Sequence, residues 1–190
     1  DIPSESTFSR AFAEYAQGCL PQKIHEAMVK AHCGERIAGH VSRDATAIEA
    51  REKAAKKQPA DPAPLTKRKR GRPRRGEEAA PRPPKKLDLQ LGRSLEENLK
   101  DLPYHCDVGT KKDSKGYKMT WRGYKLHIDC IDGDIPVSAL LTSASLHDSQ
   151  AAIPLAQMTS KRVTSLYDLM DSAYDAPQIL GHGLLQSQEL

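Results

Sequence analysis

Two aspartates, far apart in the sequence, each follow a short apolar stretch. Asp44 comes after the stretch that begins at Ile37, and Asp171 comes after the stretch from Ser165 to Met170. Such stretches are typical of buried strands, and the small polar residues after each aspartate can open a helix. Carboxylates on strand ends suit Mg²⁺ or Mn²⁺, and two such ions can activate an oxygen nucleophile and stabilise a leaving 3′ oxygen. The pattern therefore predicts Asp44 and Asp171 as metal ligands in phosphodiester chemistry.

A second interpretation applies to both aspartates. An aspartate between a strand and a helix often caps the helix, because its side-chain oxygen accepts a hydrogen bond from a backbone N–H of the first turn. Position in the sequence does not choose between a cap and a metal ligand, so both interpretations stay open for Asp44 and Asp171.

The first third of the chain is predicted to hold two helices, a strand and a third helix. Aromatic and aliphatic residues recur at helical spacing in residues 6–17 and again in residues 21–32. Residues 36–41 alternate as in a strand. Residues 45–57 are rich in Ala, Glu, Arg and Lys, which favours a helix until Pro59 ends it. These elements would carry Asp44 at the junction of strand and helix.

The second half of the chain is predicted to form a hairpin, a helix and a further strand. Residues 117–131 give the clearest strand pattern, and a turn at 132–134 leads into a second alternating segment at 135–142. A helix follows at 149–158, with Asp148 or Ser149 interpreted as its cap, and a strand at 165–170. A hairpin followed by a helical crossover indicates an α/β fold in which a mixed sheet is flanked by helices.

Lys125 and His127 alternate away from the apolar side of the predicted strand at 117–131, the side that holds Tyr124 and Leu126. The simpler interpretation is that they lie on a solvated strand face. The alternative is that they contact DNA or a metal-bound phosphate. Trp121 in the same strand also has two interpretations, stacking on a base and burial in the core.

A strongly basic, proline-rich segment interrupts the predicted fold. Residues 53–86 hold thirteen Lys or Arg, three acids and seven of the 13 prolines, so this segment carries +10, whereas the remaining 16 basic and 22 acidic residues carry −6. Such a composition cannot bury enough apolar surface to pack. We therefore expect a disordered basic arm joined to a mildly acidic folded body, with order returning near Leu87 and a short helix around Leu95 and Leu99.

No stretch of the sequence approaches the roughly 20 apolar residues of a membrane span, and the amino terminus lacks the pattern of a secretory signal. We expect an intracellular protein without a membrane partner. The 4 cysteines are scattered, which favours free thiols. The pairs His32-Cys33 and His105-Cys106 would make a zinc site only if the fold brought them together.

Six short motifs, occurring in one order between about Gly34 and Ile179, resemble the bacterial insertion-sequence transposases of the DDE type. The motifs are residues 44–52, 111–116, 121–127, 131–136, 140–149 and 171–175. The resemblance implies a ribonuclease H-like core with Asp44 and Asp171 as its first and second catalytic aspartates. It implies metal-dependent cleavage and transfer of DNA strands, with Mg²⁺ or Mn²⁺ as cofactor, with transposon ends and target DNA as partners, and with a homo-oligomer formed on DNA.

In this family the third metal ligand is a glutamate on a later helix. Only Asp175 and Glu189 follow Asp171 here; Asp175 is interpreted as a cap and Glu189 lies in an unpatterned tail. The chain also begins at Asp1 rather than at a methionine. We therefore expect a truncated transposase that is nearly inert alone, because each 1.36 kcal/mol lost from transition-state stabilisation slows a reaction tenfold.

The basic arm contains a second, independent signal. Residues 67–76 resemble an AT-hook, whose Gly-Arg-Pro centre corresponds to Gly71, Arg72 and Pro73. The narrow minor groove of A·T-rich DNA attracts inserted arginines, and glycine permits close approach. Arg70 and Arg72 would enter the groove, while Arg74 and its neighbours would neutralise phosphates. The alternative is a merely solvated run of charges.

These observations predict five segments. They are a helical segment (1–33), the first part of a transposase core (34–57), the basic arm (58–93), the second part of the core (94–180) and a tail (181–190). They also leave two functions open: a metal-dependent transposase of the bacterial cytoplasm and nucleoid, intact or decayed, and a non-catalytic binder of A·T-rich DNA that acts through the basic arm.

Overall fold

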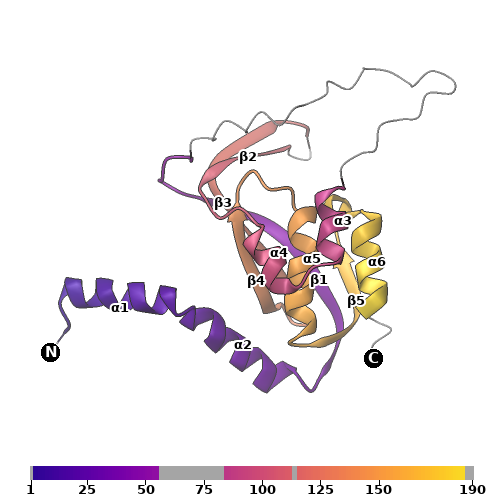
Figure 1. Cartoon of the computed structure of the whole chain (residues 1–190), viewed down its shortest axis with the longest axis horizontal. Coiled ribbons are helices and arrows are strands. Elements are labelled where there is room, and N and C mark those ends of the chain that lie inside the picture. Colours follow the sequence, from indigo (N-terminus) through magenta and orange to yellow (C-terminus); the bar gives the residue numbers. More distant parts are fainter. Residues whose placement is uncertain (1, 56–83, 113–114, 187–190) are drawn as a thin grey trace.

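A mixed sheet of five strands forms the centre of the part of the protein that the computed structural model describes, residues 2–55, 84–112 and 115–186 (Figure 1). The strands are β1 (Ile37–Glu49), β2 (Asp107–Lys112), β3 (Lys118–Ile131), β4 (Ile135–Ser143) and β5 (Thr164–Met170). Strand β1 pairs antiparallel with β3 on one side and parallel with β5 on the other. Two strands pair antiparallel with the opposite edge of β3: β2 with the beginning of β3 and β4 with the remainder. The predicted α/β class with a mixed sheet is confirmed.

Helices gather on one side of the sheet. The helices are α1 (Glu5–Gln17), α2 (Leu20–Cys33), α3 (Lys86–Leu91), α4 (Leu95–Lys100), α5 (Ser149–Ser160), the short 3₁₀ helix η1 (Ser172–Tyr174) and α6 (Pro177–Gln186). Helix α5 packs on β3 and β4, and α3, α4 and α6 pack on α5 (Figure 1). Because α5 lies between the sheet and three other helices, Ala151, Ala152, Ile153 and Leu155 are fully buried. This helix is the centre of the hydrophobic core.

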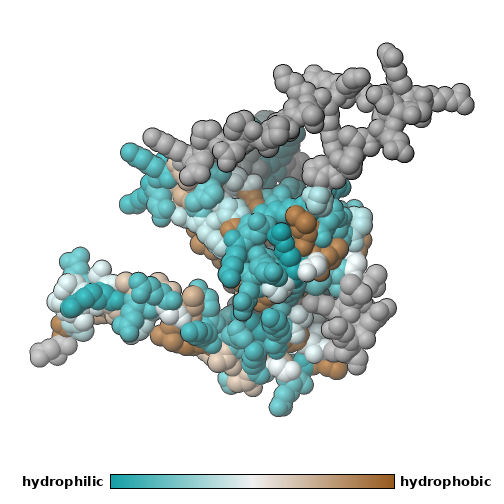
Figure 2. Space-filling view, viewed as in Figure 1, coloured by the Kyte–Doolittle hydropathy of each residue, from teal (hydrophilic) through white to brown (hydrophobic). Residues whose placement is uncertain are grey.

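The two amino-terminal helices agree with the prediction from periodicity. Helix α1 has no buried residue, and it stands off the sheet in Figure 1. Helix α2 contacts the body along its second half: His25 hydrogen-bonds the Pro136 carbonyl (2.9 Å), Glu26 pairs with Arg162 (3.3 Å), and Val29 and Cys33 join a buried cluster with residues of β1, β3 and β4. Figure 2 shows hydrophilic and hydrophobic residues mixed along this projecting segment. The segment is therefore tied to the fold through α2.

The helix predicted for residues 45–57 is wrong, because β1 continues to Glu49 and no helix follows before Ala55. Pairing with β3 explains the difference: the register runs without interruption from Val41 opposite Ile131 to Glu49 opposite Gly123. Backbone hydrogen bonds to a neighbouring strand override a weak local preference for helix. Residues 56 and 57 lie outside the described part.

The remaining predicted elements of the second half are confirmed. Strands β3 and β4 form a hairpin, and its turn contains Gly133 and Asp134, both with positive φ. Helix α5 and strand β5 have the predicted positions. Helix α4 begins at Leu95, and its N-cap, Ser94, forms a capping box with Glu97. The helical pattern around Leu95 and Leu99 was thus sufficient to locate it.

The interpretation of the Lys125–His127 side of β3 as a solvated face is wrong. His127 and Asp129 are fully buried, because α5 crosses this face of the sheet, whereas Tyr124 and Leu126 on the other face are only partly buried. The alternation itself is as predicted. The buried polar face is stabilised by an ion pair between Arg43 and Asp129, and Asp129 also accepts a hydrogen bond from Thr159 of α5 (2.6 Å).

The basic arm and the tail are described only in part. Residues 56–83, with the AT-hook-like Arg70, Gly71, Arg72, Pro73 and Arg74, lie outside the described residues, so the expected disorder of the arm is not tested. Helix α3 begins at Lys86, close to Leu87, where the folded structure was predicted to resume. The tail predicted to lack a pattern is helical as far as Gln186. Among the helices described, none is long and apolar enough to cross a membrane.

Candidate functional site

Asp44 and Asp171 each follow the last paired residue of two adjacent parallel strands. Pairing of β1 with β5 ends with Arg43 opposite Met170; Asp44 is the next residue of β1, and Asp171 is the first residue after β5. Arg43 Nη1 contacts Met170 Sδ at 3.3 Å on the helix-covered face. Because side chains alternate along a strand, both aspartates belong to the opposite face. The fold thus brings together the two carboxylates that the sequence singled out, although Asp44 lies within β1 and not at its end.

Each aspartate makes one local hydrogen bond. Asp171 Oδ1 accepts from Ala173 N at 2.9 Å and caps the short helix η1. Asp44 Oδ1 accepts from Ala45 N at 2.7 Å, and no helix follows it. The cap interpretation is therefore right for Asp171 and wrong for Asp44. Both side chains are exposed, and each of these bonds uses a single carboxylate oxygen.

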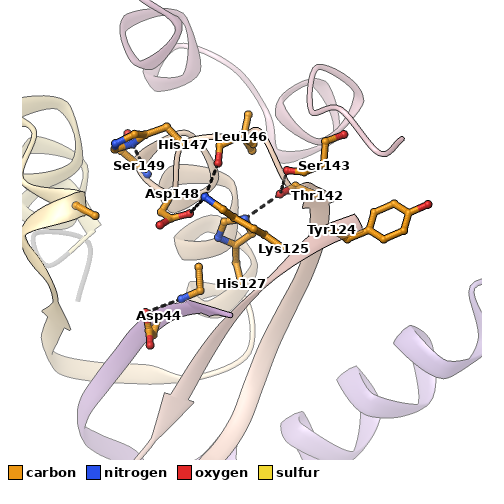
Figure 3. A network of polar contacts seen from close by, with 12 residues as sticks. Asp44, Tyr124, Lys125, His127, Thr142, Ser143, Leu146, His147, Asp148 and Ser149 are labelled. Carbon is orange, nitrogen blue, oxygen red and sulfur yellow. Dashed lines mark hydrogen bonds and ion pairs between the residues drawn. The ribbon is translucent and has the colours of Figure 1, made fainter. Parts of the chain in front are cut away.

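A second polar cluster is formed by residues of β3, of β4 and of the segment before α5, on the helix-covered face of the sheet (Figure 3). Lys125 Nζ donates to Asp148 Oδ1 and to the carbonyl of Leu146, both at 2.8 Å. The same ammonium lies 5.8 Å from the centre of the Trp121 ring. Asp148 precedes α5, but its side chain makes no capping hydrogen bond, so the cap assigned to it from the sequence is wrong. It is instead the ion-pair partner of Lys125.

His127 belongs to this cluster and is completely buried. Its Nε2 shares a hydrogen bond with Thr142 Oγ1 (2.9 Å), and its Nδ1 has no hydrogen-bond partner among the described residues. Burial lowers the pKa of His127 to about 4, against the opposing effect of the Asp148 carboxylate. The imidazole is therefore neutral at pH 7. A side chain with no exposed surface offers no direct contact to DNA, which was one of its two sequence interpretations.

Tyr174 connects the two groups of carboxylates. Burial raises the pKa of its hydroxyl, and the negative charges of Asp148, Asp44 and Asp171 raise it further. The hydroxyl has no hydrogen-bond partner within the described ranges. The side chain of Tyr174 therefore lies within electrostatic range of Asp44, Asp148 and Asp171. Sequence reasoning gave Tyr174 no role; its position three residues after Asp171 was the available signal.

The carboxylates match the chemistry of a hard cation, since Mg²⁺ and Mn²⁺ prefer oxygen ligands. Asp44 and Asp171 are the residues that would hold such an ion. Within the described ranges, no group of three or more His, Cys, Asp or Glu side chains is arranged to hold a metal ion. The carboxylate oxygens of Asp44 and Asp171 therefore fit a hard cation in type, and these two side chains are the ligands that the described residues would provide.

The two His-Cys pairs considered for zinc have other surroundings. Cys33 lies in the buried cluster at the end of α2, and Cys106 contacts the Glu52 carbonyl through its sulfur at 3.7 Å. All 4 cysteines are free thiols. Neither pair belongs to a group of three or more potential metal ligands in the described part of the chain.

Comparison with known proteins identifies no relative: no family model matches the chain, and neither a curated protein nor a solved structure matches it.

Proposed function

We propose that this chain is a DNA-processing protein of the insertion-sequence transposase type, with a ribonuclease H-like core. The observation that carries the proposal is the position of Asp44 and Asp171, 127 residues apart, each directly after the last paired residues of the parallel strands β1 and β5. Exposed carboxylates held by a rigid sheet are suited to binding the divalent cations of phosphodiester chemistry. The order of the six transposase-like motifs supports the same conclusion.

The chain's own residues have distinct roles in this proposal. Asp44 and Asp171 would hold Mg²⁺ or Mn²⁺, which when bound supplies activation of the attacking oxygen and stabilisation of the leaving one. The η1 cap keeps the Asp171 carboxylate in a defined orientation through its bond with Ala173 N. Lys125 forms an ion pair with Asp148, which limits the electrostatic repulsion between Asp148 and the carboxylates of Asp44 and Asp171.

DNA is the proposed partner, in the form of transposon ends and target DNA. The basic arm would provide most of the affinity, with Arg70 and Arg72 in the minor groove and Arg74 on phosphates. Assembly of several copies on DNA and action at the bacterial nucleoid are part of the same proposal. Cleavage by this chain alone is expected to be weak, because two carboxylates lack the third ligand of the family's site.

Metal binding coupled to DNA cleavage tests the proposal. The full chain is titrated with Mn²⁺ by calorimetry and is incubated with duplex DNA and Mg²⁺, in parallel with Asp44→Asn, Asp171→Asn and the surface control Asp134→Asn. We expect Mn²⁺ binding that both site variants lose and the control keeps, with slow cleavage that follows the same order. Unchanged metal binding in both site variants would refute the assignment of the site.

A non-catalytic binder of A·T-rich DNA is the second candidate, favoured by the Gly-Arg-Pro centre of the arm. The two functions differ in their response to a chelator. A binder keeps its salt-dependent DNA affinity in EDTA and shows no cleavage with any divalent metal, whereas the transposase-type protein also shows a metal-dependent product.

A further inference from the structure

Strand β2 and the beginning of β3 form a two-stranded ribbon that extends beyond the rest of the sheet (Figure 1). The pairing of β1 with β3 ends at Gly123, and the pairing of β4 with β3 ends at Tyr124. Residues 118–121 of β3 are therefore paired with β2 and, in the described part of the chain, with no other strand. We call residues 108–112 and 115–122 the ribbon. Its side chains beyond the root are exposed on both faces.

The root of the ribbon is fixed to the body. The Trp121 ring packs directly over Gly109, where an added Cβ would come within 2.5 Å of the ring. Trp121 Nε1 donates to the Tyr124 carbonyl at 3.1 Å, and Lys125 approaches the same ring. The described strands of the ribbon are thus fixed in orientation relative to the body at their root, which favours binding to a rigid partner.

The ribbon is strongly basic. Its positively charged residues are Lys111, Lys112, Lys115, Lys118 and Arg122. Asp107, the carboxylate at its root, is buried, and Asp113 at the tip lies outside the described residues. No acidic side chain is thus exposed on the described part of the ribbon.

The register places like charges opposite each other. Lys112 pairs directly with Lys118, and the neighbouring pair on the same face is Thr110 with Thr120, whose hydroxyls lie 3.5 Å apart. Arg122 follows on this face. Two lysines directly opposite in an antiparallel pair destabilise a hairpin. An anionic partner would remove this repulsion, so the face is suited to a polyanion.

The basic arm leaves the body beside this ribbon. Ala55, the last residue described before the arm, donates its backbone N–H to the Cys106 carbonyl at 2.9 Å, immediately before β2. Ala50 N likewise donates to the Arg122 carbonyl at 2.9 Å. The two most basic segments of the chain therefore start from the same end of the molecule, where a single DNA duplex can reach both.

We propose that the ribbon is a DNA-binding element that acts together with the basic arm, an inference that rests on the proposed function because it takes DNA as the partner. The major groove of B-DNA admits a two-stranded antiparallel ribbon. Lys112, Lys118 and Arg122 contact phosphates from one face, and Lys111 lies on the other face. In this proposal the ribbon fixes the orientation of the bound duplex relative to the folded body, and the basic arm binds the same duplex.

The test compares DNA binding by the full chain with that of two double variants. Lys112→Gln/Lys118→Gln removes two charges from the ribbon, and Lys23→Gln/Lys161→Gln removes two exposed charges from α2 and the end of α5. Affinity for a fluorescent duplex is measured by anisotropy as a function of salt. Since each phosphate contact contributes about 0.9 to the slope of log K against log salt, we expect the ribbon variant to lose about 2 from that slope. The control should keep the wild-type slope.

Trp121 gives a second readout, because it is the single tryptophan of the chain and lies at the root of the ribbon. We expect duplex DNA to change its emission in the wild type and in the control variant, and much less in the ribbon variant. Equal slopes and equal emission changes in all three proteins would overturn the ribbon as a contact while leaving DNA binding through the arm intact. Absence of salt-dependent binding in the wild type would overturn the proposed function and this inference together.

Discussion

Arg43 of β1 and Asp129 of β3 form a bidentate ion pair in the interior of the protein. Arg43 Nε donates to Asp129 Oδ1 at 2.8 Å and Nη2 donates to Oδ2 at 2.7 Å, with both side chains almost completely buried. Asp129 also accepts from Thr159, and Arg43 Nη1 lies 3.7 Å from Asp168 of β5. The pair thus joins β1, β3, β5 and α5, and Arg43 immediately precedes Asp44 in β1.

Removal of one partner of this ion pair should destabilise the fold severely. Asp129→Ala leaves a buried guanidinium without its carboxylate, and we expect a loss of about 3–5 kcal/mol in the free energy of unfolding. Urea denaturation followed by circular dichroism measures it. Lys30→Ala, which breaks the exposed pair with Glu26, should cost at most about 0.5 kcal/mol. Similar midpoints for the two variants would contradict the structural role of the buried pair.

Protonation of His127 should couple stability to acid pH. The pKa of His127 is about 4 in the folded protein and 6.5 in the unfolded chain, so the unfolded chain binds the proton more readily. Stability should therefore be independent of this residue above about pH 7 and should fall as the pH drops from 6.5 towards 4, by up to about 3 kcal/mol.

Unfolding curves at several pH values for the wild type, His127→Gln and the exposed control His32→Gln check this prediction. The slope of stability against pH should be shallower only in His127→Gln. A wild-type slope in that variant would show that other groups are responsible.

Replacement of Asp171 should separate its role as the cap of η1 from its proposed role as a metal ligand. Asparagine retains the oxygen that caps η1 but not the full negative charge, so Asp171→Asn should keep the thermal stability and lose metal affinity at least tenfold. Alanine should also lose the cap, with an added cost of about 1 kcal/mol. Differential scanning calorimetry and Mn²⁺ titration on the two variants distinguish these effects. Equal melting temperatures for both variants would argue against the cap.

A side chain at Gly123 should not be tolerated. Gly123 has a φ of 147°, and an added Cβ would collide with the Ile48 carbonyl of β1. Gly133 also has a positive φ (83°), but open space surrounds it. We expect Gly133→Ala to cost about 1 kcal/mol, and Gly123→Ala to cost clearly more, because the backbone of β1 must also move. Thermal melts of both variants compare the two costs.

Deletion of α1 should leave the folded body intact. Because α1 buries no residue, a chain that begins at Gly18 should melt within a few degrees of the full chain. Val29→Ala at the end of α2 should lower the melting temperature more, since it removes buried methyl groups from the cluster with Val41 and Val163. A large loss of stability on deletion of α1 would show that this helix is part of the folding unit.

The elements that were predicted correctly have strong local patterns. Helices α1, α2 and α5 show the spacing of apolar residues that one helix face requires, and the β3–β4 hairpin combines period-two alternation with a glycine turn. The same local reasoning singled out Asp44 and Asp171, although Asp44 lies within β1 and only Asp171 directly follows a strand. Such signals depend only on neighbours along the chain.

The sequence alone thus determined helices α1, α2, α4 and α5, the β3–β4 hairpin, strand β5 and the mixed character of the sheet. Tertiary structure decided how far β1 extends, because its second half prefers helix locally and becomes a strand only through hydrogen bonds to β3. It also decided which face of β3 is buried. Alternation divides the side chains of a strand into two sets, but only the position of α5 shows that the set with His127 and Asp129 lies inside. There the ion pair between Arg43 and Asp129 offsets the cost of removing these two charges from water.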